Sequence, residues 1–261
     1  MIAAIPDANR THLAEGYSAV AAHLAAALGV PVEFRPTLDY TATVEAFRNG
    51  DVQLAWFGGV TGVQARRAVP GARAIAQGRV DPEFVSYFIA HAGVGITPSE
   101  TFPLALAGKR FTFGPETSTS GRVMPEAFLR AATGQSPQQF FGGPNRYTKG
   151  HDLTAKEVES GAVDAGVVSF AKYDDMVARG QLDPARCVKV WVTPPYPDYN
   201  WTAPPLLEER FGSGFTERLQ AALVAIQDPT LLAVLLRKDG LIPADNADFE
   251  PLAAAMAAIG M

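Results

Sequence analysis

A short run of hydroxyl side chains stands between an apolar strand pattern and a helical pattern. It contains three consecutive residues: Ser118, Thr119 and Ser120. Serine and threonine are favoured N-caps, because their side-chain oxygens accept hydrogen bonds from the open N–H groups of the first helical turn. A helix N-terminus also carries partial positive charge, so the hydroxyl run could bind a small oxyanion. The alternative is a plain N-cap with two spare hydroxyls.

Two further polar residues could take part in anion recognition. His151 begins another helical pattern, where the helix dipole disfavours an imidazolium ion and leaves a neutral N–H donor. Asp198 lies with Tyr199 in a stiff loop, residues 193–201, which contains three prolines. The alternatives are a structural histidine and an aspartate that only forms a turn.

Catalytic and metal-dependent chemistry fit the sequence less well. Ser120, His151 and an aspartate could form a triad, but Ser120 does not lie in a G-x-S-x-G turn. The sequence contains no P-loop and no glycine-rich dinucleotide fingerprint. Tyr40, Tyr87, His151 and Tyr199 could hold a ferric ion, which would leave the hydroxyl run without a purpose. We therefore predict a binding protein without catalytic residues, metal or cofactor.

The composition limits the class of protein. Of the 261 residues, 48% are hydrophobic and 19% are charged, which allows a sizeable core and argues against wholesale disorder. The net charge is -5 and no lysine or arginine run exists, so nucleic-acid binding has no electrostatic support. The single cysteine, Cys187, excludes an intramolecular disulfide. The N-terminus has no basic segment followed by a long apolar one, so we expect either a cytosolic protein or one whose signal peptide has been removed.

Strand and helix patterns alternate along the first half of the chain. We expect strands at 2–5, 32–34, 52–57 and 72–76, with helices between them, and a longer β-rich segment at 83–90. This alternation predicts βαβ units and a parallel sheet. The polar turns after strands in such a sheet line its ligand site, and here they include Tyr40 and Trp56.

The middle of the chain repeats this alternation. Strands are expected at 110–113, 140–141, 163–168 and 189–192, and helices at 119–132, 148–160 and 170–179. The tail after Asn200 contains mainly helical patterns, at 215–225, 231–236 and 249–259. We expect the tail to pack on the first α/β unit, giving lobe I from 1–90 plus 195–261 and lobe II from 91–194. Two crossing strands would then join the lobes around a ligand cleft.

Several of these segments, taken in order, resemble the phosphonate/phosphite-type substrate-binding proteins of ABC transporters. The matching segments are Ala4-Ile5-Pro6-Asp7, Asp39-Tyr40, Leu54-Ala55-Trp56-Phe57-Gly58-Gly59, Phe113-Gly114, Ser118-Thr119-Ser120-Gly121, Gly150-His151-Asp152, Val163-Asp164-Ala165-Gly166, and Thr193-Pro194-Pro195 through Trp201.

The resemblance implies a type II periplasmic-binding-protein fold of the α/β class. It implies that Ser118, Thr119 and Ser120 grip a tetrahedral oxyanion. The residues expected around that anion are Tyr40, Trp56, Tyr87, His151, Asp198 and Tyr199. It also implies an exported protein, periplasmic or lipid-anchored, that delivers its ligand to a membrane permease, and we expect a monomer.

One departure from the family pattern narrows the range of expected ligands. Members that bind aminophosphonates carry an acidic residue after the Asp-Ala-Gly strand, where this chain has residues 167–170 without an acid. A buried amine would lack its partner there, which costs several kcal/mol. We expect phosphite or a small phosphonate, with selenate or a related oxyanion as the first alternative. A ligand-sensing module or an oxyanion-processing enzyme is the remaining alternative. Because a carboxylate accepts a proton, an inward-facing Asp198 would favour a protonated phosphorus oxyanion over sulfate-type ions.

Overall fold

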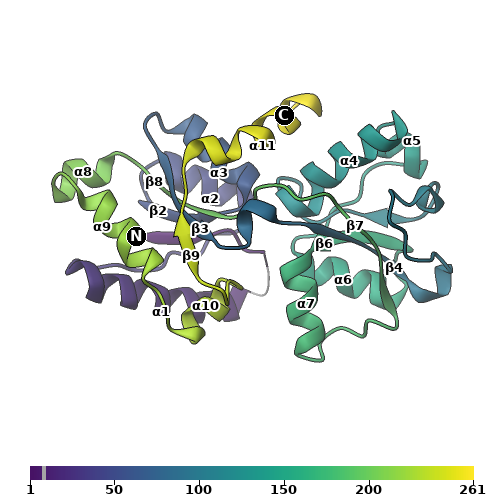
Figure 1. Ribbon diagram of the computed structural model, residues 1–261, viewed down its shortest axis with the longest axis horizontal. Coiled ribbons are helices and arrows are strands. Elements are labelled where there is room, and N and C mark those ends of the chain that lie inside the picture. Colours follow the sequence, from purple (N-terminus) through teal and green to yellow (C-terminus); the bar gives the residue numbers. More distant parts are fainter. Residues whose placement is uncertain (8–9) are drawn as a thin grey trace. The chain divides into compact units, whose positions relative to one another are not determined.

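The structure, a computed structural model, describes residues 1–7 and 10–261, without the side chains of residues 10–13. The chain forms two compact units. Unit 1 comprises Met1–Glu83 with Pro197–Ala253, and unit 2 comprises Phe84–Tyr196 with Ala254–Met261. Each unit has its own sheet with helices packed against it, so both are α/β (Figure 1).

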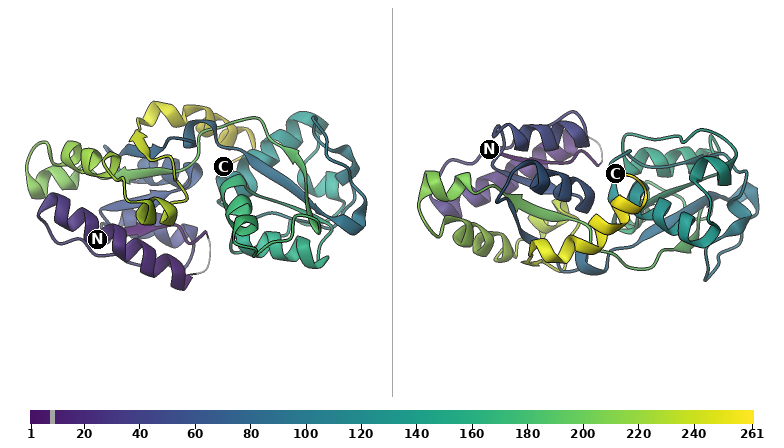
Figure 2. Two further views of the ribbon diagram at one scale, coloured as in Figure 1. Left: turned by 60° about the horizontal axis from the view of Figure 1, so that its bottom comes forward. Right: turned by 90° about the horizontal axis from the view of Figure 1, so that it is seen from above.

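The sheet of unit 1 has the strand order β1-β2-β8-β3-β9. Its strands are β1 Ile2–Ala4, β2 Leu54–Phe57, β3 Arg73–Gly78, β8 Asn200–Ala203 and β9 Leu241–Pro243. Its helices are α1 Arg10–Leu28, α2 Tyr40–Arg48, α3 Gly59–Ala68, α8 Leu206–Phe211, α9 Phe215–Val224 and α10 Pro229–Val234. Helix α1 lies beside α9 and α10, and α2 lies beside α3 (Figures 1 and 2).

Two expectations for unit 1 are wrong. The expected strand at 32–34 is only an isolated bridge between Ile2 and Phe34, because Pro31 and Pro36 flank it and limit its pairing. The sheet is also not purely parallel. Strands β8 and β9 come from the tail, β8 lies antiparallel between β2 and β3, and β9 is antiparallel to β3.

The sheet of unit 2 has the order β5-β6-β4-β7, with β4 antiparallel to both neighbours and β5 parallel to β6. Its strands are β4 Ser86–His91, β5 Phe111–Thr112, β6 Ala165–Ser169 and β7 Cys187–Val192. Its helices are α4 Met124–Thr133, α5 Pro137–Phe141, α6 His151–Ser160 and α7 Phe170–Ala178. Apolar side chains from α4 and α5 pack on one face of the sheet and those from α6 and α7 on the other. Unit 2 therefore has three layers.

The expected strand at 140–141 is wrong, because these residues end α5. Ser136 and Gln139 form a reciprocal capping box at the start of this helix, and Pro137 occupies its first turn. These local signals outweigh the apolar pair Phe140 and Phe141.

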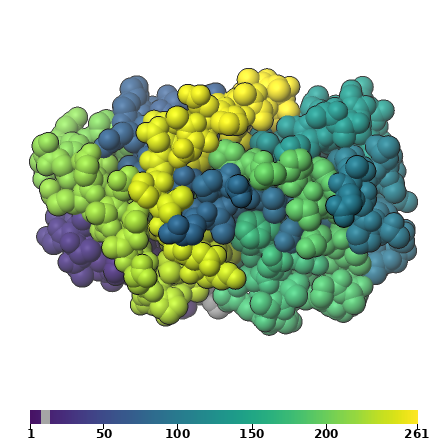
Figure 3. Space-filling model, in the orientation of Figure 1, coloured from purple at the N-terminus to yellow at the C-terminus, as the bar shows by residue number. Residues whose placement is uncertain are grey.

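The C-terminal helix α11, Glu250–Ala258, lies at the surface, where Figure 3 shows it in yellow. Its Leu252 and Met256 side chains are buried. In the part of the chain that the structure describes, no helix is both long enough and apolar enough to span a membrane.

Candidate functional site

The hydroxyl run forms the start of a continuous helical segment in unit 2. A π-helical turn, Thr119–Val123, runs directly into α4, and Ser118 is its N-cap. The Ser118 Oγ accepts the Gly121 N–H at 2.9 Å. Ser118 therefore satisfies one of the open donors of the first turn, as a cap should.

Ser120 has a different environment from its neighbour Ser118. Ser118, Thr119 and Ser120 are only 2%, 2% and 1% exposed. Among the residues that the structure describes, the Ser120 Oγ has no hydrogen-bond partner. A buried hydroxyl without a partner costs free energy, so such a group in a native protein calls for a specific explanation.

The imidazole of His151 lies beside the cap. His151 is the first residue of α6 and is fully buried. Its Nδ1 accepts the Ser169 N–H at 3.2 Å, and its Nε2 lies 3.5 Å from the Ser118 Oγ. Because Nδ1 is the acceptor, the neutral ring carries its proton on Nε2. The ring therefore presents an N–H donor on the side of Ser118.

Two glycines allow the hydroxyl run to approach the end of β5. The Gly114 N–H donates to the Gly121 carbonyl at 2.9 Å. A Cβ atom on Gly121 would lie 2.9 Å from the Ser118 Oγ, 3.0 Å from the His151 Cε1 and 3.1 Å from the Gly114 Cα. Gly121 is therefore required by close packing, a role that sequence reasoning did not assign to it.

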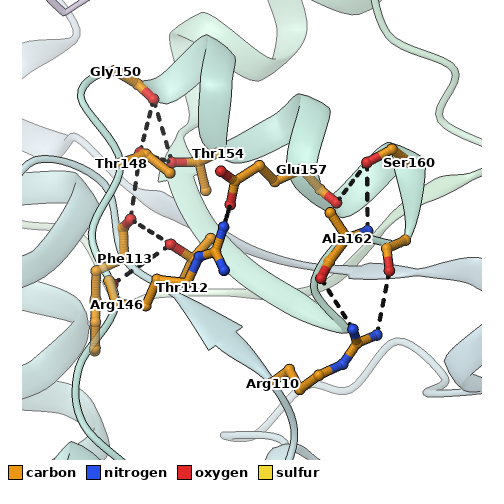
Figure 4. Close-up of polar contacts among 11 residues, drawn as sticks. Arg110, Thr112, Phe113, Arg146, Thr148, Gly150, Thr154, Glu157, Ser160 and Ala162 are labelled. Atoms are coloured by element: carbon orange, nitrogen blue, oxygen red, sulfur yellow. Dashed lines mark hydrogen bonds and ion pairs between the residues drawn. The ribbon is translucent and has the colours of Figure 1, made fainter.

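Buried threonines hold the start of α6 in place (Figure 4). The Thr148 Oγ1 donates to the Gly150 carbonyl at 3.0 Å and lies 2.6 Å from the Thr154 Oγ1. The backbone N–H of Thr148 donates to the carbonyl of Phe113, just after β5. These bonds connect the segment that carries His151 to the strand that precedes the hydroxyl run.

Tyr87 is not part of this group of donors. Its hydroxyl donates to Asp174 Oδ2 at 3.2 Å, and the Lys189 ammonium lies 4.2 Å from the centre of its ring. Burial and the neighbouring Asp174 raise the pKa of Tyr87 to about 12. Successive side chains of a strand point to opposite faces, so Tyr87 points away from the face of β4 that carries Ser86. A ligand role for Tyr87 stays a prediction.

The predicted site residues of unit 1 gather around Tyr199. Its ring stacks on Trp56 with a centroid separation of 5.6 Å, and its hydroxyl donates to Asp7 Oδ2 at 3.0 Å. Burial, followed by the charges of Asp7, Tyr40 and Asp198, raises the pKa of Tyr199 well above its usual value. Tyr40, Trp56, Asp198 and Tyr199 therefore lie close to one another and are all buried.

Asp198 lies at the positively charged N-terminus of α3. Its Oδ1 accepts the Gly59 N–H at 2.9 Å, and its own N–H donates to the Asp81 carbonyl at 3.1 Å. A carboxylate is stabilised in such a position. Asp198 thus does more than form a turn, because it binds a helix 139 positions away in sequence.

A buried ion pair under these aromatic rings was not predicted from the sequence. Arg237 Nε and Nη2 bind the Asp81 carboxylate at 2.7 and 2.6 Å. The guanidinium lies 4.6 Å from the Tyr199 ring centre and 5.4 Å from that of Trp56. The only sequence signal was a charged residue in a helical tail, and its partner is 156 positions away.

Nothing in the described part of the chain groups three or more His, Cys, Asp or Glu residues as a metal site. The hydroxyls of unit 2, the His151 N–H and the helix start are hydrogen-bond donors, and donors of this kind suit an oxyanion.

Comparison with known proteins identifies the family. Residues 2–249 match the family of periplasmic substrate-binding proteins of phosphonate ABC transporters. A probable ABC transporter phosphite binding protein, PhnD1 of Prochlorococcus marinus MIT 9301, is 37% identical over 225 residues, which are 85% of this chain and 75% of the relative. The phosphate-import protein PhnD of Mycolicibacterium smegmatis is 31% identical over 73% of this chain and 61% of its own length, less than two thirds.

Solved structures agree with this assignment. PhnD1 of Prochlorococcus marinus in complex with methylphosphonate has a TM-score of 0.92 at 33% identity, over 99% of this chain and 97% of that one. A binding protein of a phosphonate ABC transporter from Pseudomonas aeruginosa has a TM-score of 0.80 at 17% identity, over 97% and 84%, which shows the shared fold. The expected two-lobed fold and the family resemblance are confirmed. The chain belongs to the periplasmic substrate-binding proteins of phosphonate/phosphite ABC importers, a family that binds ligands and does not catalyse reactions.

Proposed function

We propose that this protein captures phosphite or a small phosphonate, such as methylphosphonate, through the hydroxyls of Ser118, Thr119 and Ser120 and the Nε2–H of His151. The observation that carries the proposal is the buried Ser120 Oγ, which has no hydrogen-bond partner among the described residues. A ligand oxygen would accept its proton and offset the cost of burying it. The bond would be charge-assisted, and such bonds are among the stronger ones in proteins.

The ligand class is supported by the donors and by the relatives. PhnD1 of Prochlorococcus marinus is named as a probable phosphite binding protein, and its solved structure contains methylphosphonate. The segment Val167-Val168-Ser169-Phe170 supplies no carboxylate for an amine, so a ligand without an amine is favoured. Phosphate belongs in the test because a second relative, PhnD of Mycolicibacterium smegmatis, is named as a phosphate-import protein.

We assign the choice among oxyanions to Asp198. A carboxylate can accept a hydrogen bond from a protonated phosphorus oxyanion but repels sulfate or selenate, which are fully ionised at neutral pH. Tyr40, Trp56 and Tyr199 would support this residue through their packing. Their contact with ligand, and that of Tyr87, stays a prediction.

Calorimetric titration in HEPES buffer at pH 7 tests the proposal with phosphite, methylphosphonate, phosphate, sulfate and selenate. We expect phosphite and methylphosphonate to bind and sulfate and selenate to give no heat. Asp198→Asn should reduce the preference for the protonated anions. Asp228→Asn is the control, because the Asp228 carboxylate also accepts a backbone N–H at a helix start but, among the described residues, bonds to none of the predicted site residues. Tight binding of selenate with no response to phosphite would contradict the proposed ligand class.

We also propose that the protein is exported, periplasmic or lipid-anchored, and acts as a monomer that delivers its ligand to the membrane permease. Cell fractionation of the native host and size-exclusion chromatography of the purified chain test these points. Recovery of the protein in the cytoplasmic fraction would contradict the export proposal.

A further inference from the structure

Ser86, a buried residue of β4, is hydrogen-bonded to the backbone of the hydroxyl run. The Ser86 Oγ lies 2.7 Å from the Ser120 carbonyl oxygen and within hydrogen-bond distance of the Tyr196 hydroxyl. A carbonyl only accepts, so Ser86 must donate its one proton to Ser120. The Tyr196 hydroxyl then donates to the Ser86 Oγ. The two bonds form a directed chain from Tyr196 through Ser86 to the peptide of Ser120.

The backbone N–H and the backbone carbonyl of Ser86 are both hydrogen-bonded to Thr193. Its N–H donates to the Thr193 Oγ1 at 2.9 Å, and its carbonyl accepts the Thr193 N–H at 3.0 Å. Phe84 and Tyr196 exchange two backbone hydrogen bonds, of 3.0 and 2.9 Å. Ser86 therefore has little freedom to move, and it is fully buried.

The residue that pairs with Ser86 in the sheet also positions the imidazole of His151. Ser86 lies directly opposite Ser169 in the antiparallel pair of β4 and β6. The Ser169 N–H is the donor that fixes the Nδ1 of His151. One pair of facing residues thus positions both kinds of donor, the Ser120 loop through Ser86 and the imidazole through Ser169.

We infer that Ser86 and Tyr196 are positioning residues for oxyanion recognition, acting through the Ser120 peptide without touching the ligand. By holding the Ser120 carbonyl on the sheet side, Ser86 fixes the peptide that carries the Ser120 Oγ, which has no hydrogen-bond partner in the described part of the chain. The inference rests on the proposed function, because it assigns a support to the same oxyanion site. Phe84 and Tyr196 are also the first and last residues of the main segment of unit 2, so this support lies where the chain enters and leaves that unit.

Calorimetry with methylphosphonate on Ser86→Ala, Tyr196→Phe and Tyr173→Phe tests the inference. Loss of one buried hydrogen bond in the support should weaken binding roughly three- to tenfold in the first two variants. Tyr173→Phe is the matched control, because its buried hydroxyl also donates to a carbonyl of unit 2, that of Cys187 at 2.6 Å, away from the hydroxyl run. Its affinity should stay within about twofold of the wild type.

A double-mutant cycle separates positioning from a general loss of stability. In a Ser120→Ala background, Ser86→Ala should change the affinity by less than about twofold, since the hydroxyl that Ser86 positions is already gone. An equal fold-change in both backgrounds, or no effect of Ser86→Ala in the wild type, would overturn the inference. If Ser86→Ala shows no cooperative melting, Tyr196→Phe replaces it in the double-mutant cycle. An equal fold-change in both backgrounds, or no effect of Tyr196→Phe in the wild type, would then overturn the inference.

Titration of the wild type distinguishes failure of the proposed function from failure of the positioning role of Ser86 and Tyr196. If the wild-type protein binds none of the five anions, the proposed function fails and the inference fails with it. If the wild type binds methylphosphonate and Ser120→Ala weakens binding, but neither support variant does, only the inference fails.

Discussion

Replacing Ser120 with alanine should weaken ligand binding without lowering the stability of the ligand-free protein. The Ser120 Oγ is buried and lacks a hydrogen-bond partner among the described residues, so the ligand-free protein loses no bond when it is removed. Burying an unpartnered hydroxyl costs about 1–3 kcal/mol, so the free energy of unfolding should be unchanged or higher. The bound state, in contrast, loses one charge-assisted hydrogen bond.

The expected loss of affinity follows from that single bond. A hydrogen bond to a charged group contributes about 1.5–3 kcal/mol, and a central value of about 2 kcal/mol weakens binding about thirtyfold. At a ligand concentration of about 100 times the wild-type Kd, binding stabilises the wild type by about 2.7 kcal/mol. At the same concentration the variant should gain only about 0.9 kcal/mol.

Ser118→Ala provides the contrasting control at the other end of the same run. Its Oγ accepts the Gly121 N–H, so its loss removes an N-cap and should lower the free energy of unfolding by about 1 kcal/mol. Calorimetry with methylphosphonate gives the affinities, and urea unfolding with and without ligand gives the stabilities, in a buffer free of phosphate. An unchanged Kd for Ser120→Ala, or a stability loss as large as that of Ser118→Ala, would contradict a ligand-binding role for the Ser120 hydroxyl.

Three further predictions test other features. Gly121→Ala should lower both stability and affinity, because its Cβ would meet the Ser118 Oγ at 2.9 Å, whereas Gly143→Ala, with nothing within 4 Å, should match the wild type in thermal melting and calorimetry. Hydrogen bonds, chiefly from Thr216, lower the pKa of Glu208 to about 2 from 4.5. The folded state therefore binds fewer protons than the unfolded state, so this contribution to stability is present above about pH 4.5 and is lost as the pH falls towards 2. Glu208→Gln should flatten the pH dependence of urea unfolding over that window, and an unchanged slope would exclude this assignment. Burial raises the pKa of Cys187 to about 12, so the thiol should resist a disulfide reagent at pH 8 until urea unfolds the protein, and rapid native-state labelling would contradict its burial.

Features encoded within a few residues of the chain were predictable. Ser118 as the N-cap depends on a bond to Gly121, three positions away, so its residue type and position were enough. The two α/β units followed from alternating patterns for the same reason. The residues at 140–141 were assigned wrongly because their hydrophobicity was given more weight than the capping box that Ser136 begins.

Features that depend on distant partners were not predictable from one sequence. The pairing of Arg237 with Asp81 spans 156 positions, and the bond from Ser86 to Ser120 spans 34. The predicted loop at 193–201 includes the first two residues of β8, because nothing local indicates that β2 and β3 both pair with this strand. The same limit applies to Tyr87, whose bond to Asp174 is visible only once β4 and α7 are packed together.

The place of β8 in unit 1 has a consequence for how the chain folds during synthesis. Strands β2 and β3 are made early, but β8, which pairs with both, begins only at Asn200. Until then each of them has an unpaired edge, the kind of surface that promotes aggregation. The four strands of unit 2 all lie between Ser86 and Val192, so its sheet can close before that of unit 1. The segment synthesised first is therefore the one whose sheet is completed last.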